Sequence, residues 1–312
     1  YGSEYIIMEF LAGNRIRALS SERTAVTSGG YGGAFDLSTL SFVRTETVAV
    51  EGDQPQGLYW KPNGTVFYVV GSIRDEVTEY DCSTPWDIST ATAGGVLSLS
   101  TEGIQPTGIF FKSDGTKFFT SDINSDSIES YTMSVAWDVT TGTVNAGEAF
   151  DISGATTNPY DIFMSTDGLK MYVIDNTSDN ILQYTLGTAY NPSTAGSLVT
   201  QSTSSWQGSP MGIFIDDSGT KMYLSGNDAL ELDQFKLTTP WDISTLEHQH
   251  TISANGTGTR SIYVKPDGLK FYDINLSADV VTEYNLGTGN GAVLYETDTN
   301  KSYVLYNGSW TE

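Results

Sequence analysis

The hydrophobic and polar positions of the chain follow one phrase that returns at nearly constant spacing. Its clearest copies are QPQGLYWKPNGTVFY (54–68), QPTGIFFKSDGTKFF (105–119), NPYDIFMSTDGLKMY (158–172), SPMGIFIDDSGTKMY (209–223) and TRSIYVKPDGLKFY (259–272). The first run of each copy is apolar at successive positions, which predicts a strand buried on both faces. The Asp-Gly or Asn-Gly pair that follows in most copies predicts a tight hairpin turn into a second strand.

Two further segments complete each repeat. A third stretch such as DNILQYTL (179–186) alternates apolar and polar residues, and a fourth such as GGVLSLST (94–101) follows a Trp-Asp signal. No segment shows a helical period. Four strands in about 50 residues, repeated along the chain, are typical of the blades of a β-propeller. Inner strands buried on both faces favour a propeller over a flat sandwich, because each blade packs between two neighbours.

Two markers indicate six repeats. Glycine occupies one turn position in five clear phrases and, 51 residues earlier, in a sixth phrase near the N-terminus: Gly13, Gly64, Gly115, Gly168, Gly219 and Gly268. Trp86, Trp137 and Trp241 follow their glycines by 22 residues, and the same offset reaches Phe35 and Tyr190. We therefore predict an all-β, six-bladed propeller of four-stranded antiparallel blades over residues 1–287, with these aromatic residues in its core.

The last repeat departs from the pattern because the offset of 22 residues from Gly268 reaches Asn290, which is not aromatic. Residues 288–312 are predicted to form a β-hairpin around Thr299-Asn300. One strand of this hairpin either completes the last blade or extends beyond it, and the manner of ring closure stays open.

The blade consensus resembles known propeller families. Proline, glycine, an apolar strand, Asp-Gly, an aromatic pair and D-x-x-x-Y, over residues 5–286, resemble the NHL and lactonase-like propellers. The TPWDIST variant (84–90 and 239–245) resembles propellers of bacteriophage and marine microbial surface proteins, and YETDTNKSYVLYNGSW (295–310) is similar to a short hairpin of phage virion and tail proteins. The first resemblance implies an architecture but no activity, since this fold carries enzymes, lectins and scaffolds.

Charge and cysteine content narrow the function classes. The chain of 312 residues carries 38 acidic and 15 basic residues, a formal net charge of −23, with no run of Lys and Arg. This charge argues against nucleic acid as a partner, because phosphates would be repelled. A single cysteine, Cys82, excludes an internal disulfide. No apolar stretch is long enough for a membrane span. Because the chain begins with Tyr1, we expect a processed product or a fragment.

The most informative candidate site is the channel mouth at which the inner strands begin. The residues just after the repeat proline position are Gln56, Thr107, Tyr160, Met211 and Arg260, and the next position holds Gly57, Gly108, Asp161, Gly212 and Ser261. Asp161 and Arg260 break the pattern with charge. We name Gln56, Thr107, Tyr160, Asp161 and Arg260 as candidate ligand-binding residues for a polar ligand such as a sugar. A mutual ion pair, or solvation in a wet channel, is the preferred interpretation of the two charges.

Catalysis and metal binding find little support in the sequence. His248 and His250 are the only histidines, and the His-x-His spacing on an outer strand places both rings on one face, where solvent exposure is favoured over metal binding. No catalytic residue is assigned. Asp122, Asn124 and Asp126 resemble a calcium loop but lack the glycine and the distal glutamate of an EF-hand. We favour a polar hairpin turn there and expect no cofactor, with Ca²⁺ as the weak alternative.

These features lead to a non-enzymatic function. We expect a phage virion-associated structural or receptor- and glycan-binding propeller, located on a virion or outside the cell. Its expected partners are other virion proteins or host-surface glycans, and the C-terminal hairpin offers a route to an oligomer. The alternatives are a polysaccharide or lactone hydrolase or lyase with its site at the channel mouth, and a bacterial surface adhesion domain. Converging carboxylates at the channel mouth would favour the hydrolase.

Overall fold

The computed structural model describes residues 34–48, 54–99, 105–227, 231–253 and 258–287 in full. It also describes the backbone of five short strands near the termini. β1 (Met8–Leu11) and β2 (Arg15–Ala18) pair as an antiparallel hairpin. β24 (Val293–Glu296), β25 (Lys301–Tyr306) and β26 (Ser309–Thr311) form a separate antiparallel sheet. Gly13, Asn290 and Thr299-Asn300 lie outside the described residues.

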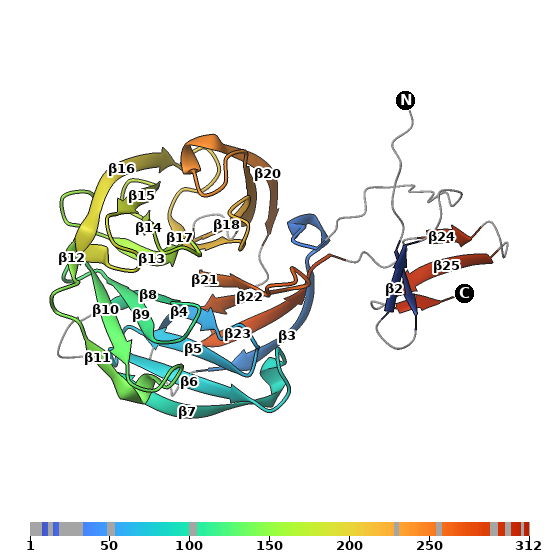
Figure 1. Cartoon of the computed structure of the whole chain (residues 1–312), viewed down its shortest axis with the longest axis horizontal. Helices are drawn as coiled ribbons and strands as arrows, with labels where there is room; N and C mark the ends of the chain where they lie inside the picture. Colours follow the sequence, from blue (N-terminus) through green and yellow to red (C-terminus); the bar gives the residue numbers. More distant parts are fainter. Residues whose placement is uncertain are drawn as a thin grey trace.

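The described residues form five blades arranged around one axis (Figure 1). Blade 1 contains β4 (Pro55–Trp60), β5 (Val66–Gly71), β6 (Glu76–Cys82) and β7 (Ala91–Ser98). Blade 2 contains β8 (Pro106–Phe111), β9 (Lys117–Asp122), β10 (Ser127–Met133), β11 (Gly142–Val144) and β12 (Phe150–Asp151), the last two both pairing with β10. The innermost strands β4 and β8 are buried along their whole length, as predicted.

Blades 3 and 4 repeat this plan. Blade 3 contains β13 (Pro159–Met164), β14 (Lys170–Asp175), β15 (Asn180–Leu186) and β16 (Ala195–Ser202). Blade 4 contains β17 (Pro210–Ile215), β18 (Lys221–Gly226), β19 (Glu231–Leu237) and β20 (Leu246–Ser253). A short 3₁₀ helix precedes the outer strand of each blade: η1 (Leu37–Thr39), η2 (Ile88–Thr90), η3 (Val139–Thr141), η4 (Pro192–Thr194) and η5 (Ile243–Thr245). None of the helices in these ranges has the length and apolarity needed to cross a membrane.

Blade 5 is assembled from both ends of the propeller. β21 (Thr259–Val264), β22 (Lys270–Asn275) and β23 (Val280–Asn285) come from the C-terminal half, and β3 (Ser41–Thr47) is the outer strand. β3 pairs antiparallel with β23, from Ser41 opposite Asn285 to Thr47 opposite Val280. Figure 1 shows β3 and β23, from opposite ends of the colour scale, side by side in this blade. The predicted alternative in which the C-terminal hairpin completes the last blade is therefore wrong.

The prediction of six blades is also wrong, and the reason lies in Phe35. The Phe35 amide donates to the Gly268 carbonyl at 2.8 Å, as the Trp86 amide donates to the Gly64 carbonyl at 2.9 Å. Phe35 therefore supplies the aromatic residue of blade 5, and Asn290 is not needed for that role. The two markers attributed to separate N- and C-terminal repeats belong to one blade that is closed by the N-terminal strand.

The aromatic residue and the Asp or Asn of each Trp-Asp signal shape the turn that precedes the outer strand of the blade. Trp86 has a positive φ of 63° and packs on Gly64, where an added Cβ would lie 2.3 Å from the Trp86 indole nitrogen. Glycine is required at that turn because its own φ is +74° and no side chain fits beneath the ring. Asp87 then caps η2 by accepting a hydrogen bond from the Ser89 amide. The four other blades repeat this arrangement with Asp36, Asp138, Asn191 and Asp242 as caps.

Tyrosine hydroxyls tie each blade to the next at most junctions. Tyr223 of blade 4 donates to the Phe35 carbonyl at 2.6 Å, and Tyr272 of blade 5 donates to the Trp86 carbonyl at 2.7 Å. Tyr68 and Tyr172 make the same bond across the junctions of blades 1 and 2 and of blades 3 and 4. The two junctions at which blade 5 closes the ring are therefore bonded like two of the three internal junctions.

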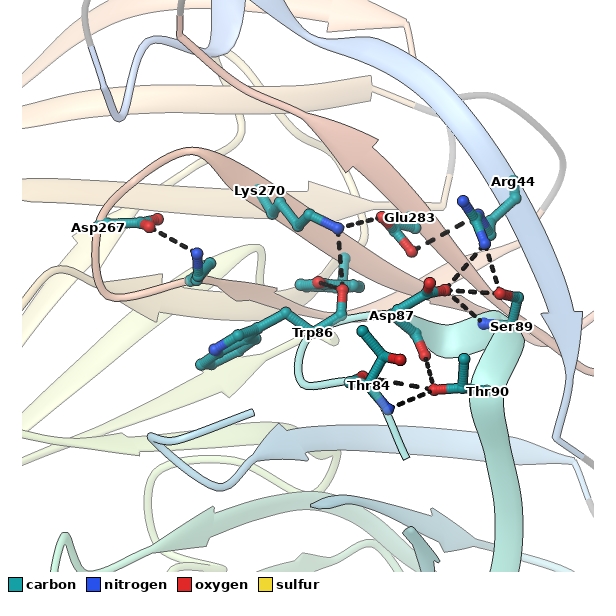
Figure 2. Close-up of polar contacts among 11 residues, drawn as sticks. Arg44, Thr84, Trp86, Asp87, Ser89, Thr90, Asp267, Lys270 and Glu283 are labelled. Carbon is teal, nitrogen blue, oxygen red and sulfur yellow. Dashed lines mark hydrogen bonds and ion pairs between the residues drawn. The ribbon is translucent and has the colours of Figure 1, made fainter. Parts of the chain in front are cut away.

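Charged side chains also lie at the junction of blades 5 and 1 (Figure 2). Arg44 of β3 donates to the Asp87 carboxylate at 2.8 Å and to the Ser89 hydroxyl of blade 1. Its Nε atom lies 3.8 Å from the buried Glu283 carboxylate, which also forms an ion pair with the Lys270 ammonium group. The closing strand is thus held to blade 5 by backbone pairing and to blade 1 by a charged side chain.

Candidate functional site

The first end of the propeller axis, where the inner strands begin, is closed by tight backbone packing. A Cβ added to Gly108 would lie 2.7 Å from the Asp161 Cα, and one added to Gly212 would lie 2.4 Å from the Arg260 carbonyl oxygen. Glycine at this level therefore lets neighbouring inner strands approach closely. The side chain of Asp161 fills the remaining space beside Gly108.

Asp161 is almost fully buried and bonded to two neighbouring strands. Its carboxylate accepts hydrogen bonds from the amides of Ile162 and Ile213, at 2.9 and 3.1 Å, and from the Ser261 hydroxyl at 3.1 Å. Burial nevertheless raises the pKa of Asp161 to about 7, because loss of hydration outweighs the three donors. Asp161 links blades 3, 4 and 5 at the axis.

Arg260 lies at the same end but has separate partners. Its guanidinium carbon is 5.6 Å from the centre of the Tyr160 ring, and its Nη1 atom is 3.0 Å from the Met211 sulfur. Burial lowers the pKa of Arg260. Among the described residues Asp161 and Arg260 form no ion pair, so the ion-pair alternative is wrong. The alternative of solvation in a wet channel stays a prediction.

The two remaining candidate residues at this end are buried. Gln56 donates to the Ser72 hydroxyl at 3.1 Å, and its Oε1 atom is buried without a hydrogen-bond partner. Thr107 donates to the Pro159 carbonyl at 2.7 Å. The structure thus brings Tyr160 and Arg260 into contact and leaves Gln56, Thr107 and Asp161 inside the packing. Ligand binding by these five residues stays a prediction.

The opposite end of the axis carries a ring of five aromatic side chains. One inner-strand residue from each blade contributes: Tyr59, Phe110, Phe163, Phe214 and Tyr263. Successive ring centres are 5.0–5.5 Å apart and the interplanar angles are 66–76°, so every contact is edge-to-face and the circle is complete. Such geometry is the favourable one for aromatic pairs. We call this set the axial aromatic ring.

The axial aromatic ring separates two spaces. Below it, toward Asp161, lies a cavity of about 10 Å³ lined by the ring and by aliphatic residues such as Ile109 and Ile213. That volume is close to the minimum that one water needs. Above the ring lies an open depression of about 340 Å³. The channel is therefore blocked along its length, and the depression has a floor.

We call this depression the aromatic cup. Each of the five glycine turns contributes to its wall the residue two positions before the glycine: Pro62, Ser113, Thr166, Asp217 and Pro266. The aromatic residues that pack on the turn glycines, here called the aromatic signal residues, are Phe35, Trp86, Trp137, Tyr190 and Trp241. Three of them, Phe35, Tyr190 and Trp241, also line the wall, together with Phe111, Met164 and Val264. Tyr59, Phe110, Phe214 and Tyr263 are each 6–8% exposed, and Phe163 is half-buried, so solvent reaches every ring of the floor. The cup combines an aromatic floor with few polar groups, as small-molecule sites do.

Asp217 is the one carboxylate that lines the cup among the described residues. In blade 4 the turn bonds are made by Asp216, whose carboxylate accepts from the amides of Thr220 and Lys221 at 2.9 and 2.8 Å. Asp217 is therefore left at the rim without a role in the turn. Partial burial raises its pKa, and the nearby Asp216 carboxylate adds to the rise.

The cup also has two tyrosines that stay neutral. Burial raises the pKa of Tyr59 and of Tyr263, and the negative charge of Asp217 contributes to both rises. Asp217, Tyr59 and Tyr263 all line the cup. Sequence reasoning assigned all five floor residues to the core, and only the unusual Asp-Asp-Ser-Gly turn of blade 4 could have signalled the cup.

The two histidines do not share a face, contrary to the prediction. A register shift in β20 places His248 opposite Phe235 and His250 opposite Gln234, which are adjacent residues of β19. His248 lies 2.9 Å from the Asp233 carboxylate and stacks on Trp206, whereas His250 is 3.9 Å from Asp36. The extra residue of a β-bulge sends the two side chains to opposite faces of the blade.

The stretch that resembles a calcium loop is a hairpin turn between β9 and β10. Asp122 accepts hydrogen bonds from the amides of Gln105 and Ser125, at 3.0 and 2.8 Å, and Asp126 has a positive φ of 48°. In the ranges that the structure describes, no group of three or more His, Cys, Asp or Glu side chains is placed to hold a metal ion.

Comparisons with known proteins identify no close relative. No protein-family model and no curated protein matches the chain. Among solved structures, the chain is similar to a "putative 6-phosphogluconolactonase" from Bacteroides uniformis, with 14% identity, a TM-score of 0.46, and coverage of 78% of this chain and 67% of that one. It is also similar to a protein from Lactobacillus plantarum, with 15% identity, a TM-score of 0.48, and coverage of 81% and 70%.

A second "putative 6-phosphogluconolactonase", from Bacteroides fragilis, shares 17% identity and a TM-score of 0.43, with 82% of each chain covered. Identities and TM-scores this low carry no argument about activity. The protein is a β-propeller of four-stranded antiparallel blades on the evidence of its own sheets.

Proposed function

We propose that the protein is a non-enzymatic binding module whose ligand enters the aromatic cup. The observation that carries this proposal is a blind depression of about 340 Å³ with an aromatic floor and polar groups confined to the rim. Binding sites for small molecules have this composition and a volume of this order. The floor is prearranged, because its five rings hold one another edge-to-face and pack on the inner strands.

A glycan end is the ligand class that we propose for the cup. Aromatic rings contact the apolar face of a sugar, and the hydroxyls of Ser113 and Thr166 with the carboxylate of Asp217 offer hydrogen bonds at the rim. One carboxylate among the described lining residues favours binding over glycoside hydrolysis, which in most families needs a pair. The roles in a virion or on a bacterial surface stay predictions.

A glycan array tests the proposal with one variant that fills the cup. Ser113 and Thr143 are both exposed, but Ser113 lies at the rim and Thr143 lies on the outer strand β11. We expect Ser113→Trp to abolish the binding seen with the unaltered protein and Thr143→Trp to retain it. A parallel hydrolysis screen should detect no turnover. Cleavage of a glycan or lactone by the unaltered protein, lost in Ser113→Trp, would establish the hydrolase instead.

A further inference from the structure

The turns around the aromatic cup share a lysine that one blade lacks. Three residues before the turn glycine, blades 1, 2 and 5 carry Lys61, Lys112 and Lys265. Each of these ammonium groups lies over the aromatic residue of the next blade, 5.6–5.8 Å from the centre of Trp137, Tyr190 or Trp86. At this distance a cation is attracted by the face of the ring.

In blade 4 a lysine at a different position makes the equivalent contact with the aromatic residue of the next blade. Asp216 stands at its turn position, and Lys221 of β18 lies 5.1 Å from the centre of the Phe35 ring in blade 5. Four of the five aromatic signal residues therefore have an ammonium group of the protein over them. The recurrence of this contact at four junctions indicates that the position suits a cation.

Trp241 is the exception. The equivalent residue in blade 3 is Ser165, whose hydroxyl donates to Asp167 within its own turn. Among the described residues no lysine or arginine lies over the Trp241 ring. Indole is also the aromatic group that attracts cations most strongly. Trp241 lines the aromatic cup, whereas Trp86 and Trp137 do not.

The turn that packs on Trp241 carries a carboxylate at the rim of the cup. Asp217 belongs to the same turn that packs on Trp241, since a Cβ added to Gly219 would lie 2.4 Å from the Trp241 ring. The rim position of Asp217 holds Pro62, Ser113, Thr166 and Pro266 in the other blades. The carboxylate is therefore specific to the blade whose aromatic residue has no lysine over it among the described residues. The net charge of −23 further favours the approach of cations.

We propose that the aromatic cup binds the ammonium group of an organic cation between Trp241, Asp217 and the axial aromatic ring. The inference rests on the proposed function of the cup and specifies its ligand. The ammonium group takes the place that a lysine of the protein occupies at the other junctions. Its source is either a small quaternary ammonium compound or an amino sugar within a glycan.

Calorimetric titration with charged and uncharged ligands of the same shape tests this proposal. Choline is compared with 3,3-dimethylbutan-1-ol, and glucosamine oligomers with N-acetylglucosamine oligomers. We expect the cation of at least one pair to bind at least tenfold more tightly than its neutral counterpart. The pair that responds identifies the source of the ammonium group. Equal affinity within both pairs would overturn the inference and leave the binding function of the cup standing.

Three variants locate the site. Asp217→Asn should weaken cation binding at least fivefold, and Ser165→Lys should weaken it at least tenfold by placing over Trp241 the lysine that blades 1, 2 and 5 carry. Asp267→Asn makes the same change of net charge at an exposed turn residue outside the cup and should leave binding unchanged. Cation binding that Asp217→Asn does not weaken would overturn the assignment. Absence of binding for all four ligands and for the glycan array would overturn both proposals.

Discussion

Asp161 and Asp273 are two carboxyl groups placed where the other blades carry small or less polar residues. Three blades have glycine at the position of Asp161, and Asp273 lies at a position where the other blades carry Val69, Thr120, Val173 and Leu224. Burial raises the pKa of both carboxyl groups to about 7, against the hydrogen bonds that they accept. Folding therefore keeps them protonated at pH values where the unfolded chain releases the proton.

The raised pKa values of Asp161 and Asp273 make the protein less stable as pH rises. A raised pKa in the folded state means that the folded protein binds more protons than the unfolded chain between about pH 4 and 7. The stability that each group contributes is present below pH 4 and is lost as pH rises toward 7. For Asp161 the loss is on the order of a few kcal/mol.

Asp161→Asn should reduce this pH dependence. We expect the variant to be less stable than the unaltered protein at pH 4. The NH2 group of asparagine has no lone pair for the amide of Ile162 or Ile213, whereas the hydroxyl oxygen of the protonated acid keeps one. The difference in stability between the two proteins should shrink by pH 7.5. Urea denaturation at several pH values measures it. A difference that stays constant or grows with pH would contradict the raised pKa.

At the scale of the element, each blade depends on one glycine and one aromatic residue that both have positive φ angles. Gly219 has a φ of +69° and supports the ring of Trp241, which has a φ of 63°. Non-glycine residues with positive φ are strained unless the surroundings fix them. Here the aromatic ring covers the turn, and its backbone donates to the glycine carbonyl.

Gly219→Ala should therefore destabilise the protein by about 2 kcal/mol or more, from the left-handed backbone and the overlap with the indole. Gly147→Ala is the matched control, because a Cβ there would meet no atom within 4 Å. We expect that control to change the free energy of unfolding by less than about 0.5 kcal/mol. Chemical denaturation compares the two variants directly. Equal effects would show that the Gly–Trp contact does not support the blade.

At the scale of the whole molecule, the ring is closed by a strand from the N-terminal side. β3 is paired along its length with β23, and the Leu37 amide donates to the buried Gln234 side chain of blade 4 at 2.7 Å. In contrast, β24, β25 and β26 pair with one another and not with a blade. The two ends of the chain therefore differ in what they contribute to the propeller.

Deletion of residues 1–47 should lower the melting temperature by at least roughly 10 °C or prevent folding, because blade 5 loses its outer strand and the aromatic residue on Gly268. Deletion of residues 288–312 should change the melting temperature by only a few degrees. Thermal unfolding followed by circular dichroism compares the two proteins. The reverse order of effects would support closure by the C-terminal segment.

The sequence predicted the blade but not the number of blades. Repeated apolar runs and Asp-Gly turns are local signals, so the strand order within a blade could be inferred from them. Phe35 and Gly268 lie 233 residues apart, and no local pattern shows that they share one blade. Assigning Phe35 and Gly268 to two separate repeats therefore led to a prediction of six blades instead of five.

The candidate site was harder to infer for a similar reason. Asp161 and Arg260 drew attention as charged departures from the repeat, yet the first end of the axis is packed closed around Asp161. Tyr59 and its equivalents were assigned to the core, and four of them are 6–8% exposed at a cup that only the assembled ring creates. The sequence shows serine at position 165, where blades 1, 2 and 5 carry lysine. Only the structure shows that those lysines lie over the aromatic residue of the next blade, so the consequence of Ser165 could not be inferred from the sequence.

The most direct test is a pair of crystal structures of the protein, one grown with saturating choline and one with saturating glucosamine oligomer. We expect the ammonium group of at least one of these ligands in the aromatic cup, within about 6 Å of the centre of the Trp241 ring and on the side of Asp217. A cup that both ligands leave empty, or binding of both only elsewhere on the propeller, would contradict the assignment of the cup as a cation-binding site.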